Sequence, residues 1–217
     1  MNIILLDSSD WERAEANGVS REEIRECITN ATEEVAKILE LPEHLNITIR
    51  PQEGMNIIPE TGEGGYTVDT ELVLLTFDAD VPYGKELLMK SLRERVFHEL
   101  NHVYRWMDLK IDRHMLNSVV FEGLATAFED EYAGAEPLWG KYDGEPVEEW
   151  LKELSTKTNT EYDAYFFRHA DGRRWMGYKV GTWLVREAMK NSGKTVIELT
   201  RMQWRELIEL AEKTSLI

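Results

Sequence analysis

The spacing of the hydrophobic residues changes near residue 84, so the two parts of the chain are expected to differ in secondary structure. Before this point, three segments show the alternation or the short apolar runs of β-strands, namely 2–7, 45–51 and 71–80. One amphipathic helix is expected over 20–41, where Ser20 and Glu23 have the spacing of a capping box. The glycine-rich residues 59–69 are expected to form a loop.

After residue 84 the periodicity of an α-helix dominates, with short breaks between segments. The longest predicted helix covers 84–107, and a second covers 117–134 after a connector at 108–116. Further helices are expected near 147–154, 159–169, 175–190 and 203–213.

These elements predict an α+β fold, in which a small N-terminal sheet with helices precedes a helical half. We expect a single domain, 1–217, made of an N-terminal α/β lobe (1–107) and a C-terminal helical lobe (108–217). The long helix 84–107 would then lie between the two lobes.

Charge and composition narrow the range of partners. Forty-one acidic and 25 basic residues give a net charge of −16, which repels phosphate backbones, so no nucleic-acid partner is expected. The sequence has no apolar run long enough to span a membrane, and its first residues lack the basic start of a signal peptide. The single cysteine, Cys27, is typical of a reducing cytoplasm, and its acidic neighbours are expected to raise its pKa.

The segment "FHELNHVYRW" holds two of the five histidines, His98 and His102, within the long predicted helix. Positions four apart lie on one helix face, so both imidazoles can reach a common tetrahedral ion such as Zn²⁺. Glu99 directly follows the first histidine and can contact water at the ion without binding the ion itself. This H-E-x-x-H arrangement is typical of metallopeptidases, in which the glutamate is the general base.

A catalytic zinc needs a third protein ligand, and the sequence offers three candidates. Asp108 follows His102 by six residues, as in metzincin-like enzymes, but this geometry requires the helix to stop at Arg105. His114 lies in the connector. Glu122 lies in "FEGLATAFE", where an otherwise apolar helix would bury its charge and a cation would compensate it. Glu122 is the favoured ligand.

Together, "HELNH" and "FEGLATAFE" resemble the gluzincin clan of zinc metallopeptidases, to which thermolysin belongs. The E-G-L-A form and "WMGYKVGTWLV" (175–185) more closely resemble a bacterial family of predicted zinc-dependent proteases, long catalogued as a domain of unknown function. The resemblance spans roughly residues 60–190 and implies a zincin-like fold. It also implies that His98, His102 and Glu122 bind zinc, with Glu99 as the base.

The resemblance further implies how substrate and ligands are oriented. Zincins pair the extended substrate with an edge strand above the active-site helix, and 71–80 is expected to be that strand. In thermolysin-type enzymes an acidic residue four positions after the glutamate ligand orients the first histidine. Here that position is Thr126, which departs from the pattern.

We therefore expect a zinc-dependent peptidase that cuts peptides or unfolded polypeptides with a zinc-activated water. Tyr178 is the first choice for the residue that stabilises the oxyanion, followed by the substrate-binding candidate His169 and by Arg168. A zincin-fold binding or scaffold protein with a structural metal is one alternative, which the intact Glu99 disfavours. A metzincin-like site through Asp108 is another.

Overall fold

The chain folds into two units, Met1–Met107 and Asp108–Ile217. The computed structural model describes residues 1–52, 57–109 and 112–212. A small sheet occurs in the first unit, and the described part of the second unit is helical, so the predicted α+β fold class is confirmed. That the whole chain works as one catalytic domain stays a prediction.

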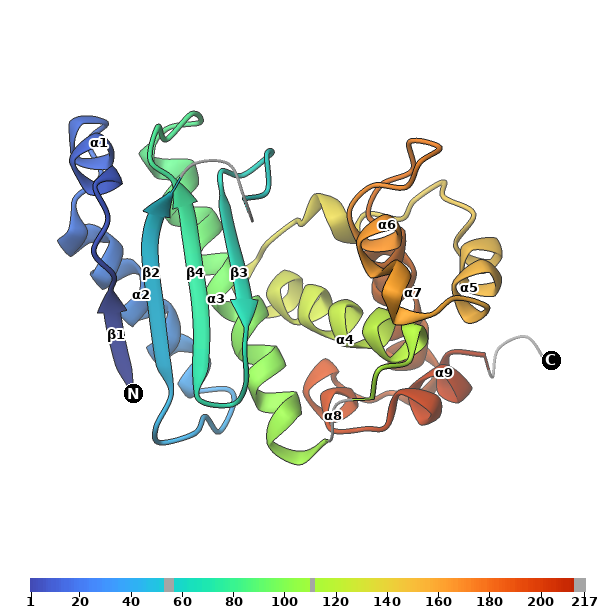
Figure 1. The fold of residues 1–217 in the computed structure, drawn as a ribbon. Helices are drawn as coiled ribbons and strands as arrows, with labels where there is room; N and C mark the ends of the chain where they lie inside the picture. Colours follow the sequence, from blue (N-terminus) through green and yellow to red (C-terminus); the bar gives the residue numbers. More distant parts are fainter. Residues whose placement is uncertain (53–56, 110–111, 213–217) are drawn as a thin grey trace. The chain divides into compact units, whose positions relative to one another are not determined.

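A four-stranded sheet forms the first unit's framework (Figure 1). Its strands are β1 (Asn2–Leu5), β2 (Asn46–Gln52), β3 (Glu63–Thr67) and β4 (Leu72–Asp78). Their order is β1-β2-β4-β3, in which β1, β2 and β4 are parallel and β3 runs antiparallel to β4. The edge strands within this unit are therefore β1 and β3.

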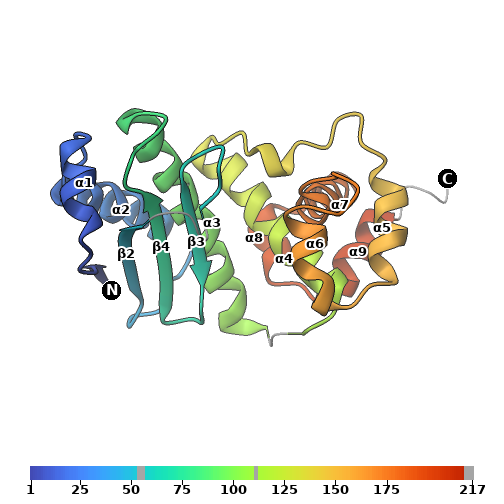
Figure 2. The same ribbon diagram turned by 45° about the horizontal axis from the view of Figure 1, so that its top comes forward.

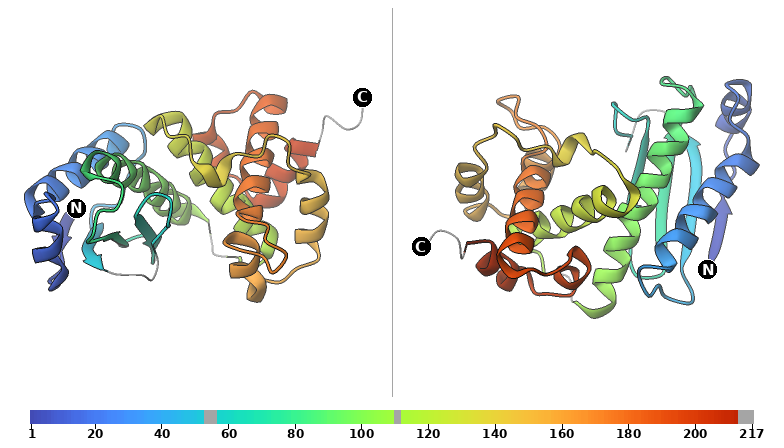
Figure 3. Two further views of the ribbon diagram at one scale, coloured as in Figure 1. Left: turned by 90° about the horizontal axis from the view of Figure 1, so that it is seen from above. Right: turned by 180° about the vertical axis from the view of Figure 1, so that it is seen from behind.

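Helices cover one face of this sheet, as the views from front and back show (Figures 1 and 3). The first unit contains α1 (Asp10–Ala16), α2 (Arg21–Ala36) and most of α3 (Lys85–Asp108). Apolar side chains of α2, α3 and the strands are fully or almost fully buried, among them Ile24, Ile28, Ile47, Ile49, Val73, Leu92 and Val96. The opposite face carries exposed apolar side chains, including Tyr66 and Leu74. The sheet thus buries one face within its own unit.

Two expectations about the sheet are wrong. Strand β3 lies inside 59–69, which the glycines had indicated to be a loop. The segment 71–80 is not an edge strand, because β4 lies between β2 and β3. Glycine has a low strand propensity, so the sequence around Gly64 and Gly65 does not predict a strand. The strand forms because its side chains pack on α3.

In the second unit, α4 and α7 cross, and shorter helices surround them (Figure 2). The α-helices here are α4 (Met115–Phe128), α5 (Val147–Ser155), α6 (Tyr162–Phe166), α7 (Met176–Ser192), α8 (Val196–Thr200) and α9 (Trp204–Glu212). Short helical turns follow α4 and precede α5 and α6: η1 (Glu129–Ala133), η2 (Leu138–Gly140) and η3 (Asn159–Glu161). The turn η1 is a π-helix and ends at Gly134, as predicted for this helix.

Most predicted helices are observed with shifted ends. The capping box of Ser20 and Glu23 is present at the start of α2. The periodicity gave no indication of α1 or α8, which are only seven and five residues long. Residues 110–111 of the predicted connector lie outside the described residues, as does residue 213 of the last predicted helix.

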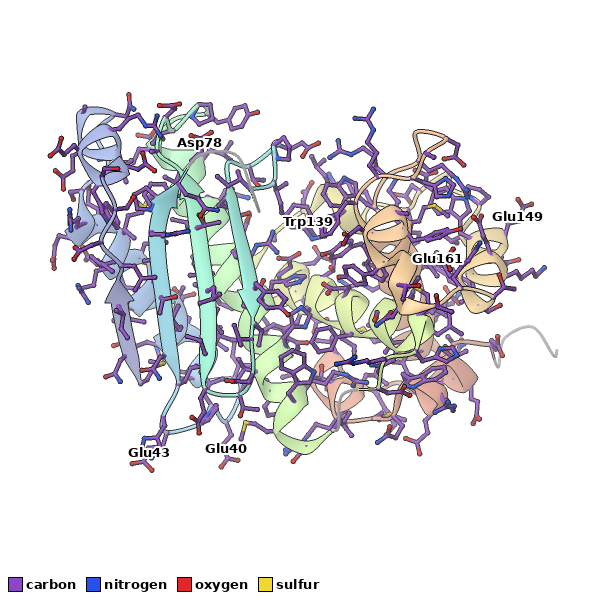
Figure 4. The ribbon with its side chains drawn as sticks, viewed as in Figure 1. Glu40, Glu43, Asp78, Trp139, Glu149 and Glu161 are labelled. Carbon is purple, nitrogen blue, oxygen red and sulfur yellow. The ribbon has the colours of Figure 1, made fainter. Side chains whose placement is uncertain are left out.

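Acidic side chains are spread over the surface of both units. Figure 4 shows Glu40 and Glu43 pointing outward from the first unit, and Glu149 from the second. No helix in the described ranges has the length and apolarity needed to cross a membrane. A cytoplasmic location stays a prediction.

Candidate active site

Helix α3 presents the histidine pair on one face. His98 and His102 are four residues apart, their ring centroids are 4.7 Å apart, and their planes are almost perpendicular. Only 1% of the surface of His98 and 4% of that of His102 is exposed. Neighbouring imidazoles at this spacing can both turn a ring nitrogen toward one ion.

The carboxylate of Glu99 is held between α3 and β3. The hydroxyl of Thr67 lies 2.8 Å from Glu99 Oε2 and 3.0 Å from the main-chain oxygen of the same residue, and it can donate to either. Both side chains are buried. One oxygen of the predicted base is therefore fixed by an edge strand of the sheet, which the sequence did not indicate.

A buried ion pair lies beside this contact. Arg95, one helical turn before Glu99, donates to both carboxylate oxygens of Glu63 on β3, over 3.0 and 3.3 Å. Its Nη1 is 3.9 Å from Glu99 Oε1. A β-carbon at Gly65 would lie 2.6 Å from Arg95 Cδ and from Glu99 Oε1, so only glycine leaves room for them here. Residues 63, 65 and 67 of β3 thus form one surface that fits α3.

Glu122 lies on α4 in the second unit and is buried. The phenol of Tyr162 donates a hydrogen bond of 2.9 Å to its Oε1. Burial raises the pKa of Tyr162 well above its usual value, and the Glu122 charge and a side-chain hydrogen bond with Tyr178 raise this pKa further. Tyr162 therefore stays protonated and remains a donor to the carboxylate.

Glu122, Tyr162 and Tyr178 lie on three helices, α4, α6 and α7, of which α7 packs closely against the other two. A β-carbon at Gly123 would lie 2.1 Å from the main chain of Gly181, so α4 and α7 touch through their backbones. At Gly177 a β-carbon would lie 2.4 Å from the ring of Phe166 on α6. Glu122 and Tyr178 stand beside these contacts in sequence, and Tyr162 opens α6.

The two alternative ligand candidates, Asp108 and His114, form contacts of other kinds. Helix α3 continues through Arg105 to Asp108, so the helix stop that a metzincin-like site requires is absent in this described segment. Asp108 forms an ion pair with Arg201. His114 caps α4 by accepting a 3.2 Å hydrogen bond from the Leu116 amide, and its ring stacks on Trp204.

The remaining predicted residues are found in varied surroundings. His169 Nδ1 is 2.9 Å from a carboxylate oxygen of Asp171, and its ring lies against Tyr165. Thr126, which departs from the thermolysin-type pattern, is fully buried, with its methyl carbon near Gly140. Burial, with a smaller contribution from the Glu34 charge, raises the pKa of the Cys27 thiol to about 11, so the thiol is not activated.

Residues 24–209 match a family described as "Predicted Zn-dependent protease (DUF2268)". The chain belongs to this family. The match confirms the resemblance to a family of predicted zinc-dependent proteases and points to a hydrolase, as a prediction for the family. No curated protein and no solved structure matches the chain.

The donor types agree with the zinc dependence that the family's description suggests. Two buried imidazoles on one turn of α3 and a buried carboxylate on α4 are the ligand set of many catalytic zinc sites. The histidines belong to the first unit and Glu122 to the second. Their convergence on one ion is therefore part of the functional proposal.

Proposed function

We propose that the protein is a gluzincin-type zinc peptidase in which His98, His102 and Glu122 hold the ion. Their residue types form a set that could bind a metal, and the family is described as zinc-dependent. Three protein ligands leave a fourth position of a tetrahedral zinc for water or substrate, as catalysis requires. A zinc ion held there would polarise the scissile carbonyl and make water a stronger acid near neutral pH.

The arrangement within the first unit is the observation that carries the proposal. There, α3 bears the two histidines, and the carboxylate between them in sequence is fixed against an edge strand. Glu99 would take a proton from the attacking water and pass it to the leaving nitrogen. A purely structural metal site would need neither this carboxylate nor its fixed orientation.

The position of β3 at the edge of the sheet favours a peptide as the substrate. Gly62 and Val68 are hydrogen-bonded to β4, through Asp78 N to Gly62 O at 2.8 Å and Val68 N to Leu72 O at 2.9 Å. Because such pairs alternate along an antiparallel ladder, the main-chain groups of Gly65 and Thr67 point away from β4. An extended peptide or an unfolded polypeptide segment could pair with them, next to Glu99.

Tyr178 remains our proposal for the donor that stabilises the oxyanion. Its hydrogen bond with Tyr162, which itself binds Glu122, supports a position close to a ligand carboxylate within the second unit. His169, which is paired with Asp171, remains the proposed substrate-binding residue.

Metal analysis combined with peptide hydrolysis tests this function. We expect about one zinc per chain in the wild type and in Glu99→Gln, and much less in His98→Ala and Glu122→Gln. Hydrolysis of a quenched-fluorescence peptide library should fall by about 10²- to 10⁴-fold in Glu99→Gln, because the general base is lost. Glu86→Gln, an exposed position on the same helix, is the control and should behave as wild type.

Two results would contradict the proposal. Equal zinc content in the wild type and both ligand variants would exclude the metal site. Unchanged hydrolysis by Glu99→Gln with zinc bound would exclude the role of the base.

A further inference from the structure

The hydrogen bond between Tyr162 and Glu122 suggests a function for a residue that the sequence motifs do not include. Tyr162 lies 40 residues after Glu122 in the chain, yet its phenol donates to Oε1 over 2.9 Å. A carboxylate has two oxygens, and one of them is therefore already engaged inside the second unit. The direction of the Glu122 carboxylate is therefore fixed in part by a contact within its own unit.

The surroundings fix Tyr162 in this position. Its ring stacks on Phe166 with centroids 4.0 Å apart and planes 7° apart. Phe166 in turn packs on Gly177, where any β-carbon would collide with the ring. Phe166 also meets the ring of Tyr178 edge to face, at 5.5 Å. The phenol is therefore held by rings packed on two helices.

The hydroxyl group of Tyr162 has a second neighbour besides Glu122. Tyr178 shares a side-chain hydrogen bond with Tyr162. The hydroxyl group of Tyr162 thus takes part in contacts with both Glu122 and Tyr178. Glu122, Tyr162 and Tyr178 therefore form one hydrogen-bonded group inside the second unit.

We propose that Tyr162 is a positioning residue that orients Glu122 as a metal ligand, with Tyr178 supporting it. This inference rests on the proposed function, since it assigns to Tyr162 the orientation of a proposed zinc ligand. Groups that hydrogen-bond to metal ligands fix the direction of the ligand before the ion arrives, and their loss typically weakens metal binding by 10- to 100-fold.

Zinc affinity, measured by competition with a chromophoric chelator, tests the proposal without relying on catalysis. Tyr162→Phe keeps the ring on Phe166 but removes the donor, so zinc affinity should fall about 10- to 100-fold. Tyr165→Phe is the matched control on the same helix. Its phenol donates to Glu153 over 3.0 Å instead, and its loss should leave zinc affinity unchanged.

A double variant separates positioning from a general effect on structure. In Glu122→Gln, which lacks the charged ligand, adding Tyr162→Phe should cause little further loss of zinc affinity, because the two residues act through one contact. Tyr178→Phe should weaken zinc binding in the same direction but less than Tyr162→Phe. It tests the same hydrogen-bonded group if Tyr162→Phe proves unstable by circular dichroism.

The outcomes for the two proposals are distinct. If the wild type binds no zinc, or if Glu122→Gln binds it as tightly as the wild type, the proposed function itself fails. If zinc binding depends on Glu122 but neither Tyr162→Phe nor Tyr178→Phe weakens it, only the positioning role is overturned. A loss of equal size in Tyr165→Phe would also overturn it.

Discussion

Two side chains that recur in the geometry of the site, Thr67 and Tyr162, hold the carboxylates on which the proposed chemistry depends. Thr67 fixes Glu99 from a strand 32 residues earlier, and Tyr162 fixes Glu122 from a helix 40 residues later. In both cases a hydroxyl occupies one carboxylate oxygen. The other oxygen then has a defined direction, as general base catalysis and metal binding both require.

Thr67→Val is expected to lower kcat by about 10- to 100-fold, because the base loses the donor that orients it. Valine has nearly the same shape, so β3 should keep its place, and zinc content should equal that of the wild type. Peptide kinetics combined with metal analysis provide the measurement.

Thr48→Val on strand β2 of the same sheet is the control for Thr67→Val. Its hydroxyl contacts the main-chain oxygen of Val73 at 3.4 Å and not a side chain of the site. Equal activity of Thr67→Val and Thr48→Val would mean that the contact with Glu99 has no role in catalysis.

The sequence predicts the residues of the proposed site better than their supporting contacts. His98, Glu99 and His102 stand out because a helix converts a spacing of four residues into a shared face. No such local rule relates Thr67 to Glu99 or Tyr162 to Glu122. These contacts depend on how distant segments pack, and in one sequence a lone threonine or tyrosine gives no sign of it.

At the scale of elements, prediction succeeded where the side-chain pattern repeats. The strands β1, β2 and β4 and the long helices have the expected alternation or helical spacing. Strand β3 does not, because Gly64 contributes no side chain and Gly65 must leave space for Arg95 and Glu99. The glycine at position 65 therefore has two effects. It removes the side-chain pattern by which β3 could be predicted, and it leaves the space in which Glu99 is positioned.

Helix packing in the second unit depends on Gly181. Alanine is more favourable than glycine inside a helix by about 1 kcal/mol, so propensity alone predicts that Gly181→Ala stabilises the protein. A β-carbon there would lie 2.1 Å from the main-chain oxygen of Val119, however. We expect the free energy of unfolding to fall by about 3 kcal/mol or more, since backbone atoms cannot yield as a side chain can.

Urea denaturation of Gly181→Ala measures this effect, and Gly172→Ala is its control. Gly172 has a φ of +94° and open space around a β-carbon, so only backbone strain of about 1–2 kcal/mol is expected. Similar losses in both variants would show that crowding between α4 and α7 is not the cause.

The carboxylate of Glu23 connects the start of α2 to the start of α3, and its pKa is lowered. Glu23 accepts a 2.7 Å hydrogen bond from Lys85 Nζ and closes the capping box with the Ser20 amide. These contacts lower the pKa of Glu23 from 4.5 to about 2. Because the folded state holds the charged form, the contribution to stability is present above pH 4.5 and is lost as the pH falls toward 2.

Glu23→Gln should therefore lower the melting temperature at pH 7, and the difference from wild type should shrink between pH 4.5 and pH 2. Thermal unfolding followed by circular dichroism over this range is the measurement. Glu26→Gln, an exposed position on the same helix, should show no comparable dependence. A difference that stays constant with pH would rule out the Glu23 charge as its source.

At the scale of the whole molecule, the proposed ligands divide between the two units, with two histidines in the first and Glu122 in the second. An ion bound by all three would connect the two units. A ligand that binds only the folded chain stabilises it by about 4 kcal/mol at a free concentration 1,000 times its dissociation constant. Here the stabilisation should depend on both units being folded, so zinc should make their unfolding more cooperative.

Differential scanning calorimetry with and without a chelator measures this coupling. With zinc we expect one transition at higher temperature, and after chelation a lower, broader or divided transition, since the units then unfold more independently. Glu122→Gln should resemble the chelated wild type even with zinc present, because the second unit no longer contributes a ligand. If zinc raises the melting temperature of Glu122→Gln as much as that of the wild type, the ion is bound within the first unit alone. The catalytic arrangement would then lack its third ligand.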